Sequence, residues 1–271
     1  MSITGKQIAF IGAGNMAEAL MKGLLSSKIV SAKQITAVDV NARRLKWLKD
    51  EYKIKTTDAS DTKLIEMADV IILAVKPQIL PEVLEEIGEI INGKIVVSIA
   101  AGISTQKIES YLSKKTPVIR VMPNMPALVC HGATAICQGK CATKTHAALT
   151  LDIFHSVGYA ILVEEKLMDT ITAVSGSGPA YVFYLMEAMI KSAIDGGLPK
   201  DKAINLVAET VRGAGELVAR GQELPGILRK RVTSPGGTTE AAIKVLDVNK
   251  VNFTLLTAIS AAVERSRELS N

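Results

Sequence analysis

Apolar residues in the first 165 positions fall into short uninterrupted runs, and the stretches between the runs have the spacing of amphipathic helices. The runs predict buried strands over residues 7–11, 35–40, 70–75, 95–99, 118–121, 133–137 and 159–163. The intervening pattern predicts helices over residues 16–26, 42–51, 81–91 and 143–155. Strands that alternate with helices form βαβ units, so we expect a doubly wound α/β domain built around a parallel sheet.

The rest of the chain has no strand pattern and predicts successive helices. Glycine and proline interrupt these helices at residues 196–199, 221 and 234–237. Some of the helices are apolar on nearly every side, since no charged residue lies between Lys250 and Glu264. Such a helix must be buried all round, and a domain of this size cannot bury it alone. We therefore expect a homodimer or a larger homo-oligomer that forms through this all-helical half.

Composition narrows the class of protein. The chain of 271 residues is 48% hydrophobic but only 4% aromatic, so its core consists mainly of aliphatic side chains and disorder is excluded. The net charge of +5 is spread along the sequence, and the basic runs lack the interleaved aromatic residues of a nucleic-acid-binding surface. A glycine-rich interruption in the longest uncharged stretch argues against a membrane span. Because no secretory signal pattern is present either, we expect a cytoplasmic protein without nucleic-acid or membrane partners.

The three cysteines predict neither a disulfide nor a metal site. Cys130, Cys137 and Cys141 are odd in number and contain no CxxC pair, so free thiols are expected. Together with His131 and His146 they lack the paired spacing of structural zinc ligands. We therefore expect no metal.

A glycine-rich loop follows the first predicted strand and opens the first predicted helix. Residues 12–17 are GAGNMA, which fits the G-x-G-x-x-G/A form of dinucleotide-binding loops. Gly12 permits the tight turn, Gly14 lets the backbone approach a pyrophosphate, and Ala17 allows close helix packing. The start of the helix offers free N–H groups to an anion. We therefore expect a Rossmann-type domain that binds a nicotinamide dinucleotide, in preference to a plain strand-to-helix turn.

The sequence leaves the choice between NADH and NADPH open. Asp39 ends the second predicted strand, where an acidic residue typically binds the ribose 2′-hydroxyl of NAD. Arg43 and Arg44 follow closely, and they either pair with the 2′-phosphate of NADP or are exposed helix residues. Lys76 lies at the end of another predicted strand. It either contacts a phosphate or the substrate, or it is an ordinary exposed lysine. The candidate cofactor-binding residues are Ile11, Gly12, Ala13, Gly14, Asn15, Met16, Asp39, Asn41, Arg43, Ala74, Val75, Lys76, Pro77, Ala100 and Ala101.

Four further motifs, together with the glycine loop and the AVKPQ segment at residues 74–78, show a resemblance to one family. They are SIAAGI at residues 98–103, RVMPNMP at 120–126, SGSGPAY at 175–181 and VTSPGGTT at 232–239. In this order, and over essentially the whole chain, the motifs resemble those of pyrroline-5-carboxylate reductases. VTSPGGTT is far more specific than the glycine loop. Asp39 departs from the family pattern, because this position is often small and polar in members that prefer NADPH.

The resemblance implies reduction of the cyclic imine 1-pyrroline-5-carboxylate to proline, the last step of proline biosynthesis, usually with NADPH and often also with NADH. It implies a dinucleotide-binding domain over residues 1–165 and an all-α substrate-binding and dimerisation domain over residues 166–271. It also implies intertwined dimers, which often assemble into decamers. In this family the SPGGTT turn holds the substrate carboxylate on backbone N–H groups, and the final threonine hydrogen-bonds the ring nitrogen. The implied substrate-binding residues are Glu165, Ser234, Gly236, Gly237, Thr238 and Thr239.

The local chemistry of the turn agrees with this implied role. Pro235 ends one predicted helix and Thr238 starts the next, so hydroxyl and N–H groups converge at a helix start, although an ordinary capped helix is the alternative. No histidine lies in such a motif, but a protonated imine already carries the electrophilic charge. We therefore expect Thr239 to act as the catalytic residue, which orients the ring and relays a proton in a near-attack geometry.

Two other functions fit parts of the sequence. A β-hydroxyacid dehydrogenase also has a sheet domain followed by helices, but it needs a catalytic lysine. Lys191 is the candidate for that role, and it lies about three turns beyond the helix start at Gly178. A protein that senses dinucleotides without catalysis would need only the glycine loop. The SPGGTT turn argues against such a sensor, which has no use for a second anion-binding helix start.

Overall fold

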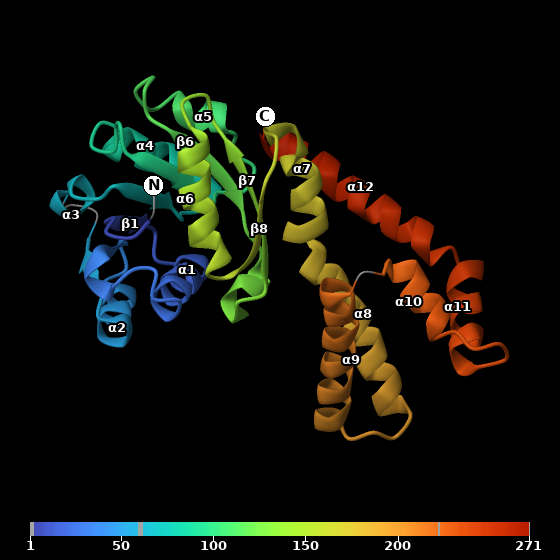
Figure 1. Cartoon of the computed structure of the whole chain (residues 1–271). Coiled ribbons are helices and arrows are strands. Elements are labelled where there is room, and N and C mark those ends of the chain that lie inside the picture. Colours follow the sequence, from blue (N-terminus) through green and yellow to red (C-terminus); the bar gives the residue numbers. More distant parts are fainter. Residues whose placement is uncertain (1–2, 59–61, 222, 271) are drawn as a thin grey trace. The chain divides into compact units, whose positions relative to one another are not determined.

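The computed structural model describes residues 3–58, 62–221 and 223–270 (Figure 1). Two compact units make up the chain. The first unit extends to Ser177 and also includes residues 262–271, and the second unit is Gly178–Ala261. The domain boundary between residues 165 and 166 that the sequence suggests stays a prediction.

The first unit contains an eight-stranded sheet with the strand order β3-β2-β1-β4-β5-β6-β7-β8. The strands are β1 (Ile8–Ile11), β2 (Ile35–Val38), β3 (Lys55–Thr57), β4 (Val70–Leu73), β5 (Ile95–Ser98), β6 (Val118–Met122), β7 (Gly132–Gln138) and β8 (Gly158–Leu162). Every neighbouring pair is parallel except β6 and β7. This confirms the expected doubly wound α/β architecture, with one antiparallel pair that the sequence did not predict.

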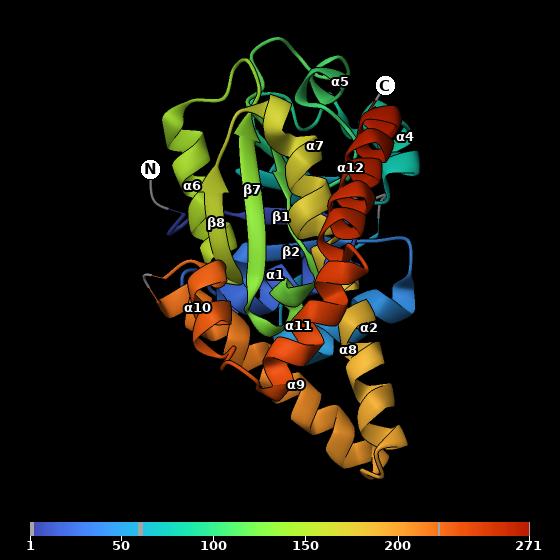
Figure 2. The same cartoon turned by 90° about the vertical axis from the view of Figure 1, so that its right-hand side faces the viewer.

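The antiparallel pair follows from the short connection between its strands. Residues 123–131 link β6 to β7 and contain only the 3₁₀ helix η3 (Met125–Val129). A parallel crossover needs a dozen or more residues, so the chain returns in the opposite direction. β8 then pairs in parallel with β7 and packs beside α6 (Figure 2).

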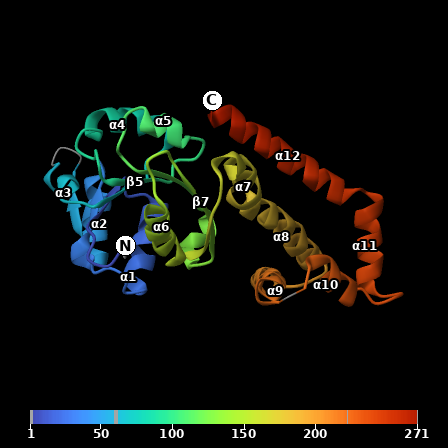
Figure 3. The same cartoon turned by 45° about the horizontal axis from the view of Figure 1, so that its top comes forward.

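Helices cover both faces of this sheet, as Figure 3 shows for α4 and α5 on one face and for α1 and α6 on the other. The helices of the first unit are α1 (Asn15–Ser26), α2 (Ala42–Tyr52), α3 (Lys63–Glu66), α4 (Leu80–Ile87), α5 (Thr105–Glu109), α6 (Lys144–His155) and α7 (Met168–Ile171). Alternate residues of β1 enter different cores: Phe10 packs with α1 and α6, and Ile11 packs with α4. Burying both faces of the strands explains their uninterrupted apolar runs.

Two of the sequence motifs lie against each other in this unit. Residues 172–176 form a π-helix shortly before α8, and its last two residues, Ser175 and Gly176, begin the SGSGPAY motif. Asn124, from RVMPNMP, is buried; its amide nitrogen donates to the Ser175 carbonyl oxygen at 3.0 Å, and its amide oxygen accepts from the N–H of Ala133 at 2.8 Å. A Cβ on Gly176 would lie 2.6 Å from Cε of Met122. Close packing of RVMPNMP against SGSGPAY therefore explains why the first motif contains Asn124 and the second contains Gly176.

The second unit is all-helical, as expected. Its helices are α8 (Gly178–Asp195), α9 (Lys200–Arg220), α10 (Pro225–Arg231), α11 (Thr238–Val248) and the first part of α12 (Val251–Ser270). α8 and α9 form a helical hairpin (Figure 1). The three predicted interruptions are confirmed, whereas the break between α11 and α12 was not predicted, because Lys250 adopts a left-handed φ of 52° without a glycine signal.

Large apolar side chains remain exposed on the helices of the second unit. Tyr184 is 78% exposed, Val248 is 72% exposed and Phe253 is 69% exposed. Exposed apolar surface of this extent is typical of a protein interface. In the part of the chain that the structure describes, no helix combines the length and the apolar character needed to span a bilayer.

Candidate functional site

A cavity of about 530 Å³ lies at the carboxyl ends of β1, β2 and β4. The strand order reverses direction at β1, and this switch point is where open α/β sheets bind ligands. Eight of the predicted cofactor residues line the cavity: Ile11, Gly12, Ala13, Gly14, Asp39, Ala74, Val75 and Lys76. The cavity therefore brings together residues from three separate segments that sequence analysis grouped as one site.

The glycine loop has the geometry of a phosphate-binding turn. Gly12 has a φ of +95°, and a Cβ at this position would lie 2.7 Å from the carbonyl oxygen of Ala74. Gly14 is the N-cap residue of α1 and provides no side-chain hydrogen bond to the helix start. The first N–H groups of this 12-residue helix therefore remain for an anion, and the loop fits the pyrophosphate of a dinucleotide.

Asp39 is fixed at the edge of the same cavity. One carboxylate oxygen accepts from the N–H of Ala13 at 2.7 Å, and the other accepts from the N–H of Asn41 at 2.8 Å. The neighbouring Val40 is 89% exposed and also lines the cavity. The carboxylate thus links the glycine loop to the end of β2 and presents its charge to a bound ligand.

Arg44 is occupied by protein groups. Its Nε donates to the carbonyl oxygen of Ala13 at 2.7 Å, its guanidinium pairs with Glu18 at 2.5 Å, and it stacks over Trp47. Glu18 also accepts from the Tyr52 hydroxyl, and burial together with this hydrogen bond raises the pKa of Tyr52 to about 12. Arg44 therefore stabilises the glycine loop through its hydrogen bond to Ala13.

The other predicted cofactor residues lie around the cavity without lining it. Asn15 and Met16 begin α1, Asn41 caps α2, Arg43 is exposed in the first turn of α2, Pro77 begins a 3₁₀ helix, and Ala100 and Ala101 follow β5. The sequence missed seven lining residues: Val38, Val40, Ile65, Ile79, Val83, Glu86 and Ile87. The two valines lie at the end of β2, and the others come from α3, α4 and the segment before α4, where apolar helical spacing indicates core as readily as a ligand pocket.

The SPGGTT turn connects α10 to α11 and has the predicted position at a helix start. Gly236 adopts a φ of +72°, and the N–H of Gly237 donates to the Ser234 carbonyl oxygen at 3.0 Å. Gly237 is the N-cap of α11 and offers no side-chain cap. The first N–H groups of α11, from Thr238 and Thr239, therefore point away from the helix without an intrahelical acceptor.

Glu240 is a residue of this turn that sequence analysis missed. Its carboxylate accepts from the N–H of Gly236 at 2.7 Å, one residue before the N-cap Gly237 whose N–H a capping box would use. The spacing of Glu240 from the turn was a signal that could have identified it. Because Gly236 and Gly237 both donate within the turn, the free N–H groups begin at Thr238.

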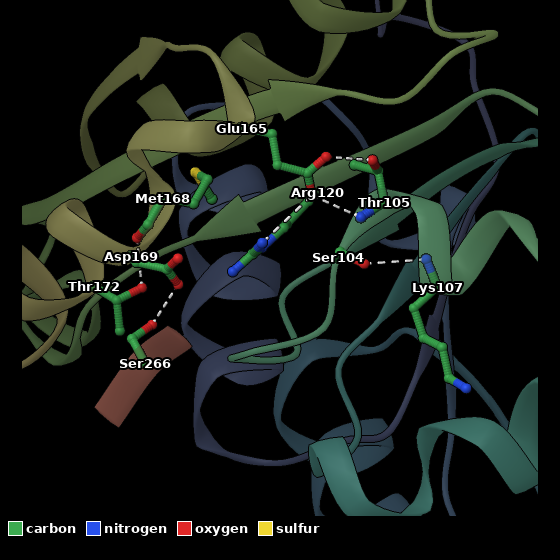
Figure 4. A network of polar contacts seen from close by, with 9 residues as sticks. All are labelled: Ser104, Thr105, Lys107, Arg120, Glu165, Met168, Asp169, Thr172 and Ser266. Carbon is green, nitrogen blue, oxygen red and sulfur yellow. Dashed lines mark hydrogen bonds and ion pairs between the residues drawn. The ribbon is translucent and has the colours of Figure 1, made fainter. Parts of the chain in front are cut away.

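Glu165 lies in a partly buried polar network in the first unit (Figure 4). Its carboxylate accepts from the N–H of Thr105 at 2.7 Å and from the Thr105 hydroxyl at 2.5 Å, and Arg120 lies 3.4 Å away. The Arg120 side chain is 6% exposed. Burial, and then the negative charge of Glu165, raise the pKa of the Cys137 thiol to about 12, so this cysteine stays protonated. The two carboxylate oxygens of Glu165 therefore accept hydrogen bonds from Thr105, at the start of α5, and pair with the buried guanidinium of Arg120.

Replacing Glu165 by alanine is expected to lower the free energy of unfolding by about 1–3 kcal/mol, because Arg120 and the N–H of Thr105 lose their acceptor. Urea unfolding followed by circular dichroism measures the change. Glu164→Ala is the matched control, since Glu164 is 72% exposed and pairs with Lys166 at the surface; we expect less than about 0.5 kcal/mol from it. Equal stability of the two variants would contradict a structural role for Glu165.

Comparison with known proteins adds two family matches. A family model described as pyrroline-5-carboxylate reductase dimerisation matches residues 165–269. A second model, described as coenzyme F420-dependent NADP oxidoreductase, matches residues 7–102, which include the glycine loop and the cavity.

Similarity extends over whole chains as well. A pyrroline-5-carboxylate reductase of Methanosarcina acetivorans is 41% identical over 97% of this chain and 98% of its own, and one of Arabidopsis thaliana is 37% identical over 97% and 95%. Among solved structures, the pyrroline-5-carboxylate reductase of Coxiella burnetii superposes with a TM-score of 0.91 at 37% identity, covering 98% of this chain and 99% of its own. The pyrroline carboxylate reductase of Plasmodium falciparum, solved with NADP bound, superposes with a TM-score of 0.88 at 30% identity and the same coverage.

Proposed function

The chain belongs to the pyrroline-5-carboxylate reductase family, and from this premise we propose how its residues carry out the reaction. The enzyme reduces 1-pyrroline-5-carboxylate to L-proline with NAD(P)H. Full-length similarity, which includes both the glycine loop and the SPGGTT turn, is the observation that supports this function. A bound nicotinamide supplies the hydride for the C=N carbon.

The first unit binds the cofactor. The free space over Gly14 and the uncapped start of α1 fit the pyrophosphate, and Asp39 lies where the adenosine ribose binds in Rossmann domains. Apolar side chains from α3 and α4 form a surface for the adenine ring. We assign Ala74, Val75 and Lys76 to the wall of the cleft, and we keep Asn15, Met16, Asn41, Arg43, Pro77, Ala100 and Ala101 as candidates at its rim.

The SPGGTT turn binds the substrate. We assign the carboxylate to the N–H groups of Thr238 and Thr239, because those of Gly236 and Gly237 donate within the turn. Ser234, Gly236 and Gly237 shape the approach to these groups. The Thr239 hydroxyl hydrogen-bonds the ring nitrogen, orients the imine and relays a proton from water to it. Glu165, in the first unit, is retained as a further substrate-site candidate.

The dimerisation segment at residues 165–269 makes the protein a homo-oligomer. We propose that pairs of chains associate through the exposed apolar faces of α8 to α12, and that dimers assemble into decamers. The division into a dinucleotide-binding domain at residues 1–165 and a substrate and dimerisation domain at 166–271 belongs to the same proposal, as does a cytoplasmic location. A monomer in sedimentation at micromolar concentration would contradict the association.

The β-hydroxyacid dehydrogenase alternative gains no support from its candidate lysine. Lys191 is exposed on α8 and pairs with Asp195 at 2.7 Å, one turn along the same helix. Such exposed pairs are common on helix surfaces and indicate no catalytic role.

The function is tested by following the absorbance of reduced nicotinamide when purified protein meets 1-pyrroline-5-carboxylate. We expect oxidation of NADH or NADPH that depends on the imine and yields L-proline, identified by chromatography. The control combines a β-hydroxyacid with oxidised cofactor. We expect no reduction of the cofactor in it, whereas a β-hydroxyacid dehydrogenase would reduce the cofactor. Stoichiometric binding of the cofactor without consumption would show a sensor in place of an enzyme.

A further inference from the structure

NADH and NADPH differ at one position, the 2′ carbon of the adenosine ribose. NADH carries a hydroxyl there, which an acidic residue at the end of the second strand binds by accepting its hydrogen bond. NADPH carries a phosphate, which needs an arginine or another cation within reach. The charges around the end of β2 therefore decide which cofactor this chain prefers.

The carboxylate of Asp39 can accept a ribose hydroxyl in its present position. It lines the cavity, and hydrogen bonds from the N–H groups of Ala13 and Asn41 fix both of its oxygens. A carboxylate has about four acceptor sites, so each oxygen keeps one for a ligand. The side chain needs no rearrangement to bind a 2′-hydroxyl.

The guanidinium of Arg44 is occupied by protein groups. Arg44 uses its guanidinium on the Ala13 carbonyl oxygen and on Glu18, and it does not line the cavity. Turning it toward a phosphate would leave the partly buried Glu18 carboxylate without its cation. Arg44 therefore serves the fold of the glycine loop.

The remaining charges around the cavity disfavour a phosphate. Among the described residues, its charged lining residues are Asp39, Glu86 and Lys76, two acids and one base, and Lys76 follows a different strand, β4. Arg43 is exposed and is not part of the lining. A 2′-phosphate would approach Asp39 as a like charge, which costs binding energy that a hydroxyl does not.

We infer that this reductase prefers NADH over NADPH, and that Asp39 is the residue that sets the preference. The inference rests on the proposed function and makes it more specific, because it selects one of the two nicotinamide cofactors. It concerns this chain's own residues, because Asp39 directly follows β2.

The test compares kcat/KM for NADH and NADPH at saturating 1-pyrroline-5-carboxylate, together with Kd for NAD⁺ and NADP⁺ from calorimetry. We expect the wild-type enzyme to favour the unphosphorylated cofactor by at least about 10-fold in both measurements. Asp39→Ser and Asp39→Asn are expected to lower kcat/KM and affinity for NADH and to raise them for NADPH. The ratio of the two kcat/KM values should shift by at least about 10-fold. Asn retains an acceptor for the N–H of Ala13, so it separates loss of charge from loss of the loop contact.

Asp50→Asn is the matched control, because it removes one exposed carboxylate near the far end of α2 without touching the cavity. Its cofactor ratio should equal that of the wild type. A wild-type preference for NADPH, or a selective loss of NADP⁺ affinity in Arg43→Ala, would overturn the inference. If neither cofactor is oxidised, the proposed function fails, and the two Kd values still decide whether Asp39 selects NAD⁺.

Discussion

Replacing Thr239 by valine lowers kcat/KM for 1-pyrroline-5-carboxylate by about 100-fold or more, if the hydroxyl orients the ring nitrogen and relays the proton. Valine has nearly the same shape, so the first turn of α11 and its N–H groups are preserved. Thr239 is only partly exposed, and within the described residues its side chain makes no hydrogen bond that valine would break. The loss therefore reports on the hydroxyl itself, and steady-state kinetics with either cofactor measures it.

The matched control is Thr239→Ser, which keeps the hydroxyl and should recover most of the activity. KM for the cofactor should not change in either variant, because the turn lies outside the cofactor cavity of the first unit. Full kcat/KM in Thr239→Val would show that another group protonates the ring nitrogen. Equal losses in the valine and serine variants would instead point to a backbone effect.

Replacing Gly12 by alanine weakens cofactor binding and destabilises the first unit. The new Cβ would lie 2.7 Å from the carbonyl oxygen and 2.8 Å from the carbonyl carbon of Ala74, and the φ of +95° is unfavourable for alanine. Backbone strain of this kind costs about 1–3 kcal/mol, and a displaced loop weakens binding by about 100-fold. Calorimetric Kd values and the melting temperature of the ligand-free protein measure the two effects.

Gly14→Ala separates the two effects. No atom lies within 4 Å of a Cβ at Gly14, and its φ of −68° suits alanine, so the ligand-free variant should keep its stability to within about 0.5 kcal/mol. Its affinity for the cofactor should still fall, because the added methyl group faces the approaching pyrophosphate. Wild-type affinity in Gly12→Ala would contradict the assignment of this loop to the cofactor.

Hydrophobic patterning was sufficient to predict most elements of the first unit, because strands buried on both faces have uninterrupted apolar runs. The short strand β3 was missed because Lys55, Thr56 and Thr57 are polar and only half-buried at the edge of the sheet. The predicted helix over residues 81–91 ends at Ile87, although apolar spacing continues beyond it. Spacing alone does not show where a chain leaves the helical conformation.

The cofactor site was predictable where chemistry depends on backbone geometry, as at Gly12, and not where it depends on tertiary partners. Arg43 and Arg44 are equivalent in sequence, but only the structure shows that Arg44 is bound to Glu18, 26 residues away. Glu165 likewise lies 60 residues from Thr105 in sequence, so no local pattern could reveal their hydrogen bonds. Interactions of this kind depend on packing that follows from the whole fold.

Hydride transfer to the imine carbon can be followed with NADH or NADPH in which deuterium replaces both hydrogens on C4 of the nicotinamide ring. Purified protein, labelled cofactor and 1-pyrroline-5-carboxylate are combined, and the proline formed is analysed by mass spectrometry and NMR. We expect deuterium at C5 of L-proline, in proportion to the cofactor oxidised. Oxidised cofactor with unlabelled proline, or no oxidation with either cofactor, would contradict direct reduction of the imine by this protein.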